Sequence, residues 1–117
     1  MKNLILIALV LILNFLITSC SVKPRKTVPE EYKAGQEYYH RECAGCHGPD
    51  AMGGNRAPNL IQKIYSSAAY SNGKISKVIL NGSSSGAMPS LKGNLSDKEI
   101  KEIIKYIRYS QKDSGLE

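Results

Sequence analysis

Five consecutive residues, from Cys43 to His47, constrain this chain more than any other feature of its sequence. Two cysteines stand three positions apart and a histidine follows the second, which is the C-x-x-C-H pattern of c-type haem attachment. On a helix, Cys43 and Cys46 share one face, so both sulfurs can reach one edge of a porphyrin. His47 is then placed to bind the iron. The pattern predicts one covalently bound haem c.

Two other sites could use the same residues. A zinc site would take His40, Cys43, Cys46 and His47 from a run of eight residues, whereas structural zinc sites usually draw their second ligand pair from a distant segment. A thioredoxin-like dithiol expects a surrounding β-α-β pattern, and no convincing strand is found here. Haem is favoured over both.

The second iron ligand must come from elsewhere in the chain, and the candidates are Met88, Met52 and His40. Met88 follows a Ser-Gly run and precedes a proline, which suits a loop that reaches the far side of a haem. Met52 is five residues from His47 and is expected to be a partly exposed loop residue. His40 is expected at the surface. The sequence therefore favours Met88.

The N-terminus has the composition of an export signal. Residues 4–17 are apolar apart from Asn14, and this stretch is shorter than the about 20 residues that a membrane-spanning helix needs. It ends in Leu16-Ile17-Thr18-Ser19-Cys20, which resembles the lipobox of bacterial lipoproteins. The other two cysteines belong to the haem motif, so Cys20 has no disulfide partner within the chain. We expect residues 1–19 to be a signal peptide and Cys20 to be lipidated, the alternative being an ordinary signal with Cys20 left free or disulfide-bonded.

The remaining 98 residues are enough for one domain. Their formal net charge is +5 once Lys2 is removed, and no groove-shaped basic motif with interleaved aromatics accompanies it, so nucleic acid is not an expected partner.

Residues 20–29 are expected to form the lipidated end and a tether that reaches about 30 Å. A helix is expected to follow, with Thr27 as its N-cap and Glu30 as its capping-box partner. Gly35 within this helix suggests close contact with another element.

The rest of the chain predicts loops and helices only. Residues 48–59 are rich in glycine and proline and are expected to be a loop. Apolar residues from Leu60 to Ala68 suggest a short helix, and a second one follows that Asn81-Gly82 would end.

The last predicted helix begins with the capping box of Ser96 and Glu99. Its core face is expected to be formed by Ile100, Ile103, Ile104 and Ile107. Its basic residues are expected to form a solvated face, or to meet an acidic redox partner or anionic lipid head groups; they are Lys98, Lys101, Lys105, Arg108 and Lys112.

From about Thr27 to Ser110 the chain resembles the class I (mono-haem) cytochromes c, and especially small bacterial domains of the cbb3-oxidase type. The motifs that carry the resemblance are Cys43-Ala44-Gly45-Cys46-His47-Gly48-Pro49-Asp50, Ala57-Pro58-Asn59-Leu60, Gly86-Ala87-Met88-Pro89 and Leu95-Ser96-Asp97. The resemblance implies an all-α fold of about four to five helices wrapped round one haem c. It assigns residues 30–112 to the cytochrome domain and leaves 113–117 as a polar tail.

The resemblance also implies the roles of single residues. Thioether links would form at Cys43 and Cys46, and His47 and Met88 would be the axial ligands of the iron. The carbonyl of Pro58 would accept a hydrogen bond from the His47 ring. The first helix would cross the last one at Gly35 and Tyr39, with Tyr106 on the other side.

The expected function is that of a membrane-anchored electron carrier in the bacterial cell envelope, facing the periplasm. It would exchange single electrons with a redox protein donor and acceptor, such as a respiratory oxidase or dehydrogenase. With both axial positions filled, no small-molecule substrate is expected. The alternatives are a fixed haem subunit of a larger oxidoreductase and a five-coordinate, gas-binding or peroxidase-like haem protein.

Overall fold

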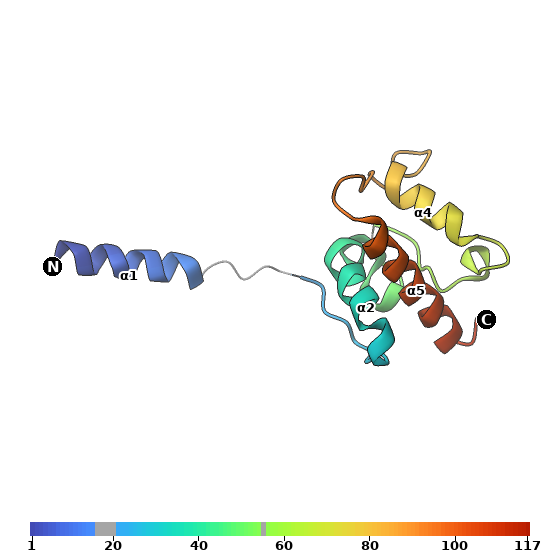
Figure 1. Ribbon diagram of the computed structural model, residues 1–117, viewed down its shortest axis with the longest axis horizontal. Coiled ribbons are helices and arrows are strands. Elements are labelled where there is room, and N and C mark those ends of the chain that lie inside the picture. The colour runs from blue at the N-terminus through green and yellow to red at the C-terminus, as the bar shows by residue number, and fades with distance from the viewer. Residues whose placement is uncertain (16–20, 55) are drawn as a thin grey trace.

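The computed structural model describes residues 1–15, 21–54 and 56–117, and within them the fold is all-α (Figure 1). The single β-bridge in these ranges joins Lys92 and Leu95. The elements are α1 (Lys2–Phe15), α2 (Glu30–Glu42), α3 (Ala44–His47), η1 (Pro49–Ala51), η2 (Lys63–Tyr65), α4 (Asn72–Asn81) and α5 (Asp97–Asp113). The expectation of four to five helices and no sheet is confirmed. Cys20, the expected lipidation site, lies outside the described residues.

Helix α1 is the apolar N-terminal stretch, and it contacts none of the other described elements (Figure 1). None of the helices in the described ranges combines the length and the hydrophobicity that crossing a bilayer requires.

The core of the domain is the crossing of α2 and α5 (Figure 1). At the crossing point a Cβ atom on Gly35 would lie 2.1 Å from the Glu102 carbonyl oxygen and 2.8 Å from Tyr106 Cβ. The close contact expected at Gly35 is therefore present. Tyr39 and Tyr106 are fully buried beside it, with ring centroids 5.3 Å apart. Burial raises the pKa of Tyr106 to about 12.

Helix α5 matches its prediction closely. Ser96 and Glu99 form the expected capping box, and the four isoleucines of the apolar stripe are buried. The helix continues to Asp113, and its late residue Gln111 is fully buried.

The start of α2 differs from the prediction. The N-cap is Pro29, in an extended conformation and without a side-chain cap, so the predicted capping box of Thr27 and Glu30 does not form. The physical reason is the proline, because its ring disfavours the helical conformation at the preceding residue, Val28. The helix can begin only at Glu30, and the two glutamates of its first turn interact favourably with the positive end of the helix dipole.

Residues 22–28, which we call the N-terminal strap, lie against the domain. Val22 and Val28 pack on the core. The backbone N–H of Arg25 donates to Asp50 Oδ2 at 2.9 Å, and Lys26 Nζ donates to Asp113 Oδ2 at 3.2 Å. This part of the expected tether is thus held in contact with the folded domain.

The segment after Leu60 contains only the short η2 turn rather than the predicted helix. Its carbonyl groups are taken by α5: Gln111 Nε2 donates to the oxygens of Leu60 and Tyr65, and Arg108 donates to those of Tyr65 and Tyr70. These carbonyls therefore accept hydrogen bonds from α5 side chains instead of from the backbone of a local helix. Helix α4, by contrast, ends as predicted at Gly82, whose φ is 80°.

Candidate cofactor site

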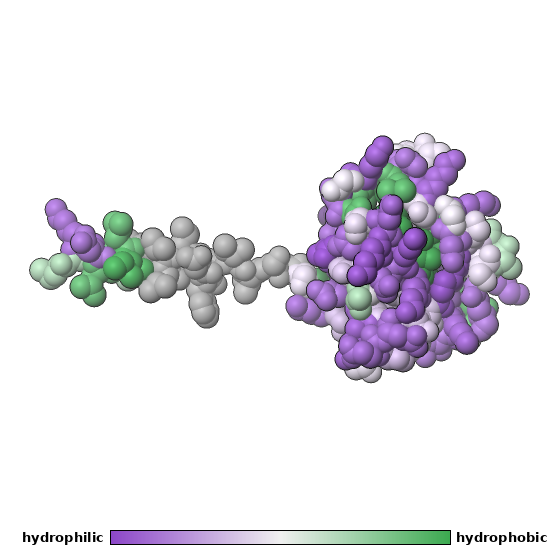
Figure 2. Space-filling view, viewed as in Figure 1, coloured by the Kyte–Doolittle hydropathy of each residue, from purple (hydrophilic) through white to green (hydrophobic). Residues whose placement is uncertain are grey.

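A cleft of about 670 Å³ opens between the helices of the domain, and its size lies within the range of cofactor sites. We call it the cofactor cleft. It brings together the residues that the sequence singled out, which are Cys43, Cys46, His47, Pro58 and Met88. Its apolar walls include Leu60, Val78, Ile79, Leu91, Ile103 and Ile107. In the space-filling view, the apolar surface of the domain shows mainly where α4 and α5 meet (Figure 2).

The C-x-x-C-H segment lies at one wall of the cleft because α2 leads directly into α3. The N–H of Cys43 still donates to Tyr39 at the end of α2, and the Cys43 carbonyl accepts from the N–H of His47 at 2.9 Å. Cys43 is 8% exposed, whereas Cys46 is exposed. Burial, and then the nearby Glu42 and Cys46, raise the pKa of the Cys43 thiol to about 12.

The His47 ring is oriented by one backbone contact. Its Nδ1 lies 3.0 Å from the carbonyl oxygen of Pro58, to which an Nδ1–H donates. This tautomer leaves Nε2 with a free lone pair, which is the form that binds a metal. The loop between them closes tightly, since Gly53 N–H donates to His47 O at 2.7 Å and a Cβ on Gly48 would meet Gly53 O at 1.9 Å. Gly48 also has a left-handed φ of 75°.

Met88 enters the cleft on a loop that is held by Ser83. The N–H of Met88 donates to Ser83 Oγ at 3.0 Å, and the Met88 carbonyl accepts from the N–H of Ser83 at 3.0 Å. A Cβ on Gly82 would lie 2.6 Å from that carbonyl, so the loop also approaches the end of α4 closely. The sequence suggested a flexible Ser-Gly run here, but Ser83 fixes both backbone polar groups of Met88.

The other candidates for an iron ligand lie elsewhere. Met52 is 53% exposed, as expected, and is not among the residues that line the cleft. His40, expected at the surface, is instead 7% exposed, and this prediction is wrong. Its Nδ1 lies 2.7 Å from the Gln36 carbonyl oxygen, and its Nε2 accepts the N–H of Asp50 at 3.2 Å. Both ring nitrogens are therefore occupied.

The burial of His40 comes from the turn that follows the motif. Asp50 and Ala51 have left-handed φ angles of 55° and 62°, which bring the chain back against α2. Asp50 is buried and accepts hydrogen bonds from the Tyr106 hydroxyl at 3.3 Å and from the N–H of Arg25. Sequence reasoning missed this cluster. The sequence signal that could have revealed it is the position of His40, which directly follows Tyr39 and precedes Cys43 by three residues.

The zinc alternative gains no support, since no group of three or more His, Cys, Asp or Glu side chains converges on a metal position within the described ranges.

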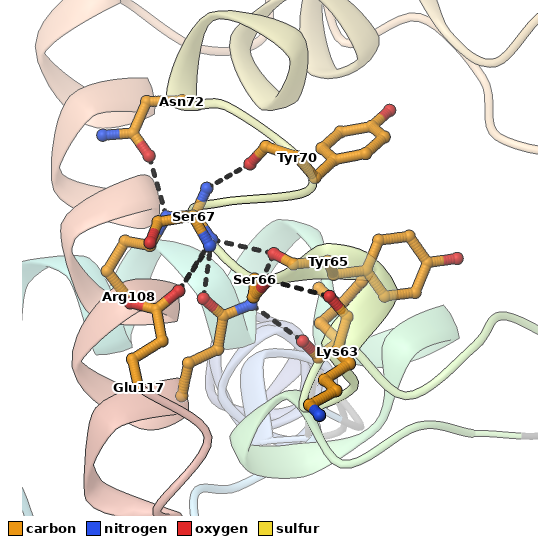
Figure 3. A network of polar contacts seen from close by, with 10 residues as sticks. Lys63, Tyr65, Ser66, Ser67, Tyr70, Asn72, Arg108 and Glu117 are labelled. Atoms are coloured by element: carbon orange, nitrogen blue, oxygen red, sulfur yellow. Dashed lines mark hydrogen bonds and ion pairs between the residues drawn. The ribbon is translucent and has the colours of Figure 1, made fainter.

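The wall formed by residues 60–72 is held by Arg108 (Figure 3). The guanidinium donates to the Tyr65 carbonyl and to Asn72 Oδ1, each at 2.8 Å, and to the Tyr70 carbonyl. Its side chain is only 14% exposed, so the prediction of a solvated basic face fails at this position. Because Tyr65 and Tyr70 line the cleft, Arg108 fixes the cleft's shape without lining it.

Comparison with known proteins decides which family this site belongs to. The model of the family described as "Cytochrome C oxidase, cbb3-type, subunit III" matches residues 30–107. The chain belongs to this cytochrome c family. Membership implies one covalent haem c, and the cleft fits that group: it holds two thiols, an oriented imidazole and a thioether within apolar walls. The domain is a mono-haem c-type cytochrome.

Individual relatives agree with this assignment. The cytochrome domain is 40% identical over 73 residues to cytochrome c-551 of Bacillus subtilis. The match covers 62% of this chain and 58% of that protein. The domain is 35% identical over 79 residues to cytochrome c6 of Leptolyngbya boryana, covering 63% of this chain and 86% of the relative. The crystal structure of the c-type cytochrome XoxG from Methylobacterium extorquens AM1 superimposes with a TM-score of 0.60 at 25% identity, over 74% of this chain and 54% of that one. The chain thus spans less than two thirds of cytochrome c-551 and of XoxG.

Proposed function

We propose that this cytochrome is anchored to a membrane by a lipid on Cys20 and passes single electrons between redox proteins in the bacterial cell envelope, facing the periplasm. The proposal assigns residues 1–19 to a signal peptide, 30–112 to the cytochrome domain and 113–117 to a polar tail. The observation that carries the electron-transfer part is that His47 and Met88 line the same cleft as Cys43 and Cys46.

In this proposal Cys43 and Cys46 would hold the haem by thioether bonds, and His47 and Met88 would bind its iron. Haem c, when bound, supplies an iron that changes between its ferrous and ferric states. The Pro58 carbonyl keeps the His47 ring in one tautomer and orientation, with Nε2 free to bind the iron. Ser83 holds Met88 at its backbone, and the apolar walls exclude water. With both axial positions occupied by protein, no small-molecule substrate has access to the metal.

The axial assignment is tested by absorption spectroscopy of the ferric holoprotein. We expect a methionine-to-iron charge-transfer band that Met88→Ala abolishes and Met52→Ala leaves unchanged, since Met52 is exposed outside the cleft. A band that survives in Met88→Ala would overturn the assignment. No band in the unsubstituted protein would favour the five-coordinate alternative, in which the haem binds a gas or acts as a peroxidase.

Covalent attachment and lipidation have separate tests. Haem staining after denaturing electrophoresis should colour the mature band, and Cys43→Ala with Cys46→Ala should remove the colour. Metabolic labelling with a radioactive fatty acid should mark the unsubstituted chain and not Cys20→Ala. A colourless band from the unsubstituted chain contradicts the haem site, and an unlabelled band from it contradicts the anchor. The two parts of the proposal therefore fail independently.

A second candidate function is a fixed subunit of a larger oxidoreductase. The description of the matching family, a subunit of a cbb3-type oxidase, favours it. Detergent extraction separates the two: a stoichiometric enzyme that purifies with this cytochrome indicates a subunit, whereas a free protein that exchanges electrons with several partners indicates a carrier.

A further inference from the structure

A second hollow, of about 520 Å³, lies on α5 away from the cofactor cleft. We call it the basic groove. Among the residues that line it are Lys101, Lys105, Arg108, Lys112, Tyr32 and Tyr109. Lys105 is two residues from both Ile103 and Ile107, whose side chains line the cofactor cleft. Two residues of α-helix turn by about 160° in the shorter sense. The basic groove and the cofactor cleft therefore open on opposite faces of α5.

Charge and aromatic rings are combined in the groove. Three lysines and Arg108 line it, and Glu117 is the one carboxylate among its lining residues in the described part of the chain. That carboxylate lies 3.8 Å from the Arg108 guanidinium and offsets the charge of Arg108. Tyr32 and Tyr109 stack with their centroids 4.2 Å apart, and Lys105 Nζ lies 5.2 Å from the Tyr32 ring centroid.

This chemistry suits the surface of an anionic bilayer better than an apolar partner. Tyrosine prefers the interface between water and hydrocarbon because its ring is apolar and its hydroxyl is polar. Lysines beside an anionic leaflet gain attraction to lipid phosphates that falls off within a Debye length. Lys105 Nζ donates to the Glu31 carbonyl oxygen at 3.0 Å and lies 3.9 Å from the Glu31 carboxylate, which offsets part of its charge.

The N-terminal strap limits how far the domain can move from a membrane. Lys26 of the strap is bonded to Asp113, which directly follows Lys112 of the groove. Val22 packs on the core, and only Ser21 stands between it and Cys20. Two residues span at most about 7 Å. A lipid on Cys20 would thus hold the domain in contact with the head groups.

We infer that the basic groove binds anionic phospholipid head groups and orients the domain on the membrane. The inference rests on the proposed lipid anchor. Bound this way, the cytochrome presents the cofactor cleft to the aqueous side, where redox partners have access. The lipid on Cys20 supplies attachment, and the groove supplies orientation.

The test measures lysine acetylation in the acylated, full-length holoprotein after reconstitution into vesicles. Vesicles of phosphatidylcholine alone are compared with vesicles that also contain phosphatidylglycerol, and a short pulse of an amine-reactive reagent is read by mass spectrometry. We expect acetylation of Lys101, Lys105 and Lys112 to be about fivefold slower with phosphatidylglycerol, which corresponds to about 1 kcal/mol per lysine at an anionic surface. High salt should abolish the difference. Lys77 and Lys92, which line neither hollow, should react equally in both.

A pair of variants makes the test specific. Lys101→Gln with Lys112→Gln should restore the acetylation rate of Lys105 in phosphatidylglycerol vesicles, whereas Lys77→Gln with Lys92→Gln should leave Lys105 protected. Far-ultraviolet circular dichroism confirms that each variant is folded. Equal acetylation in both kinds of vesicle would overturn the inference.

The outcomes also separate this inference from the lipid anchor. A protein that floats with neither kind of vesicle contradicts the anchor itself. A protein that floats with both kinds, while its groove lysines stay fully reactive, contradicts only the groove. If Lys101→Gln with Lys112→Gln instead slows electron exchange with an acidic redox protein and lipid has no effect, the groove is a protein-docking surface and the lipid inference is wrong.

Discussion

At the scale of single residues, the absence of one side chain sets the geometry of the domain. Gly35 lets α2 approach α5 so closely that its backbone contacts Glu102 and Tyr106. Tyr39 and Tyr106 fill the space on one side of this contact, and both are fully buried. Any larger residue at position 35 must push the two helices apart.

We predict that Gly35→Ala lowers the free energy of unfolding by about 2 kcal/mol or more, because the added methyl overpacks a rigid backbone contact. Guanidinium unfolding of the holoprotein measures it. The control is Gly73→Ala in α4, where the nearest atom to a new Cβ is 3.9 Å away. That change should stabilise the protein by up to about 1 kcal/mol through helix propensity. Equal stability of the two variants would contradict the tight crossing.

Single residues also show what the sequence could and could not predict. Gly35 was predictable because glycine inside a helix requires a reason. His40 was not, because its burial depends on a turn whose left-handed residues are Asp50 and Ala51 rather than glycine. Arg108 was misread for a related reason. A basic residue on a helix is usually solvated, and only the folded chain brings the carbonyls of Tyr65 and Tyr70 to it.

At the scale of elements, α5 is the best-predicted part of the chain because its signals are local. The capping box and the isoleucine stripe need no information from other segments. The capping residue Glu99 also joins two elements, since Arg41 near the end of α2 donates to its carboxylate at 2.8 Å. Hydrogen bonds from the Ser96 backbone, from Arg41 and from the Ser96 hydroxyl lower the pKa of Glu99 to about 2.

We predict that Glu99→Gln removes part of the acid dependence of stability. The pKa of Glu99 is about 2 in the folded protein and about 4.3 in an unfolded chain. Its carboxylate therefore stabilises the fold above the unfolded pKa, and this contribution is lost as the pH falls through 2. Thermal unfolding should show the variant less stable near neutral pH, with the difference from the native protein disappearing as the pH falls below 2.

The control for this prediction is Glu37→Gln, which removes an exposed carboxylate that has no ion pair in the described part of the chain. Its stability should run parallel to that of the native protein through the acid range. A constant difference between Glu99→Gln and the native protein at every pH would mean that the charge of Glu99 has no role.

At the scale of the whole molecule, the cleft is closed by contacts between segments far apart in the chain. Arg108 and Gln111 of α5 hold the segment between Leu60 and Asn72, which forms one wall. Figure 3 shows the contacts of Arg108. The loop lacks regular structure of its own beyond η2, so these side chains replace the missing backbone hydrogen bonds. The sequence predicted a short helix from Leu60 to Ala68, and this prediction is wrong because the path of the segment depends on contacts from α5.

We predict that Arg108→Lys destabilises the protein by about 1–3 kcal/mol, because a single ammonium cannot reproduce the forked contacts and leaves carbonyl groups without partners. Hydrogen exchange should accelerate in residues 60–72 and much less at the crossing of α2 and α5. Lys98→Gln, at an exposed position of the same helix, should change neither. Uniform acceleration across the domain would show that Arg108 supports the fold as a whole rather than this wall.

The crossing of α2 and α5 also sets an order of events during biosynthesis. Tyr39 meets Tyr106, a partner that is synthesised much later. Domains form as units, so α2 has no surface to pack on until α5 emerges. Cys43, which the finished fold buries, is therefore accessible through most of that period. The helix that completes the core also ends the period in which the Cys43 thiol is accessible.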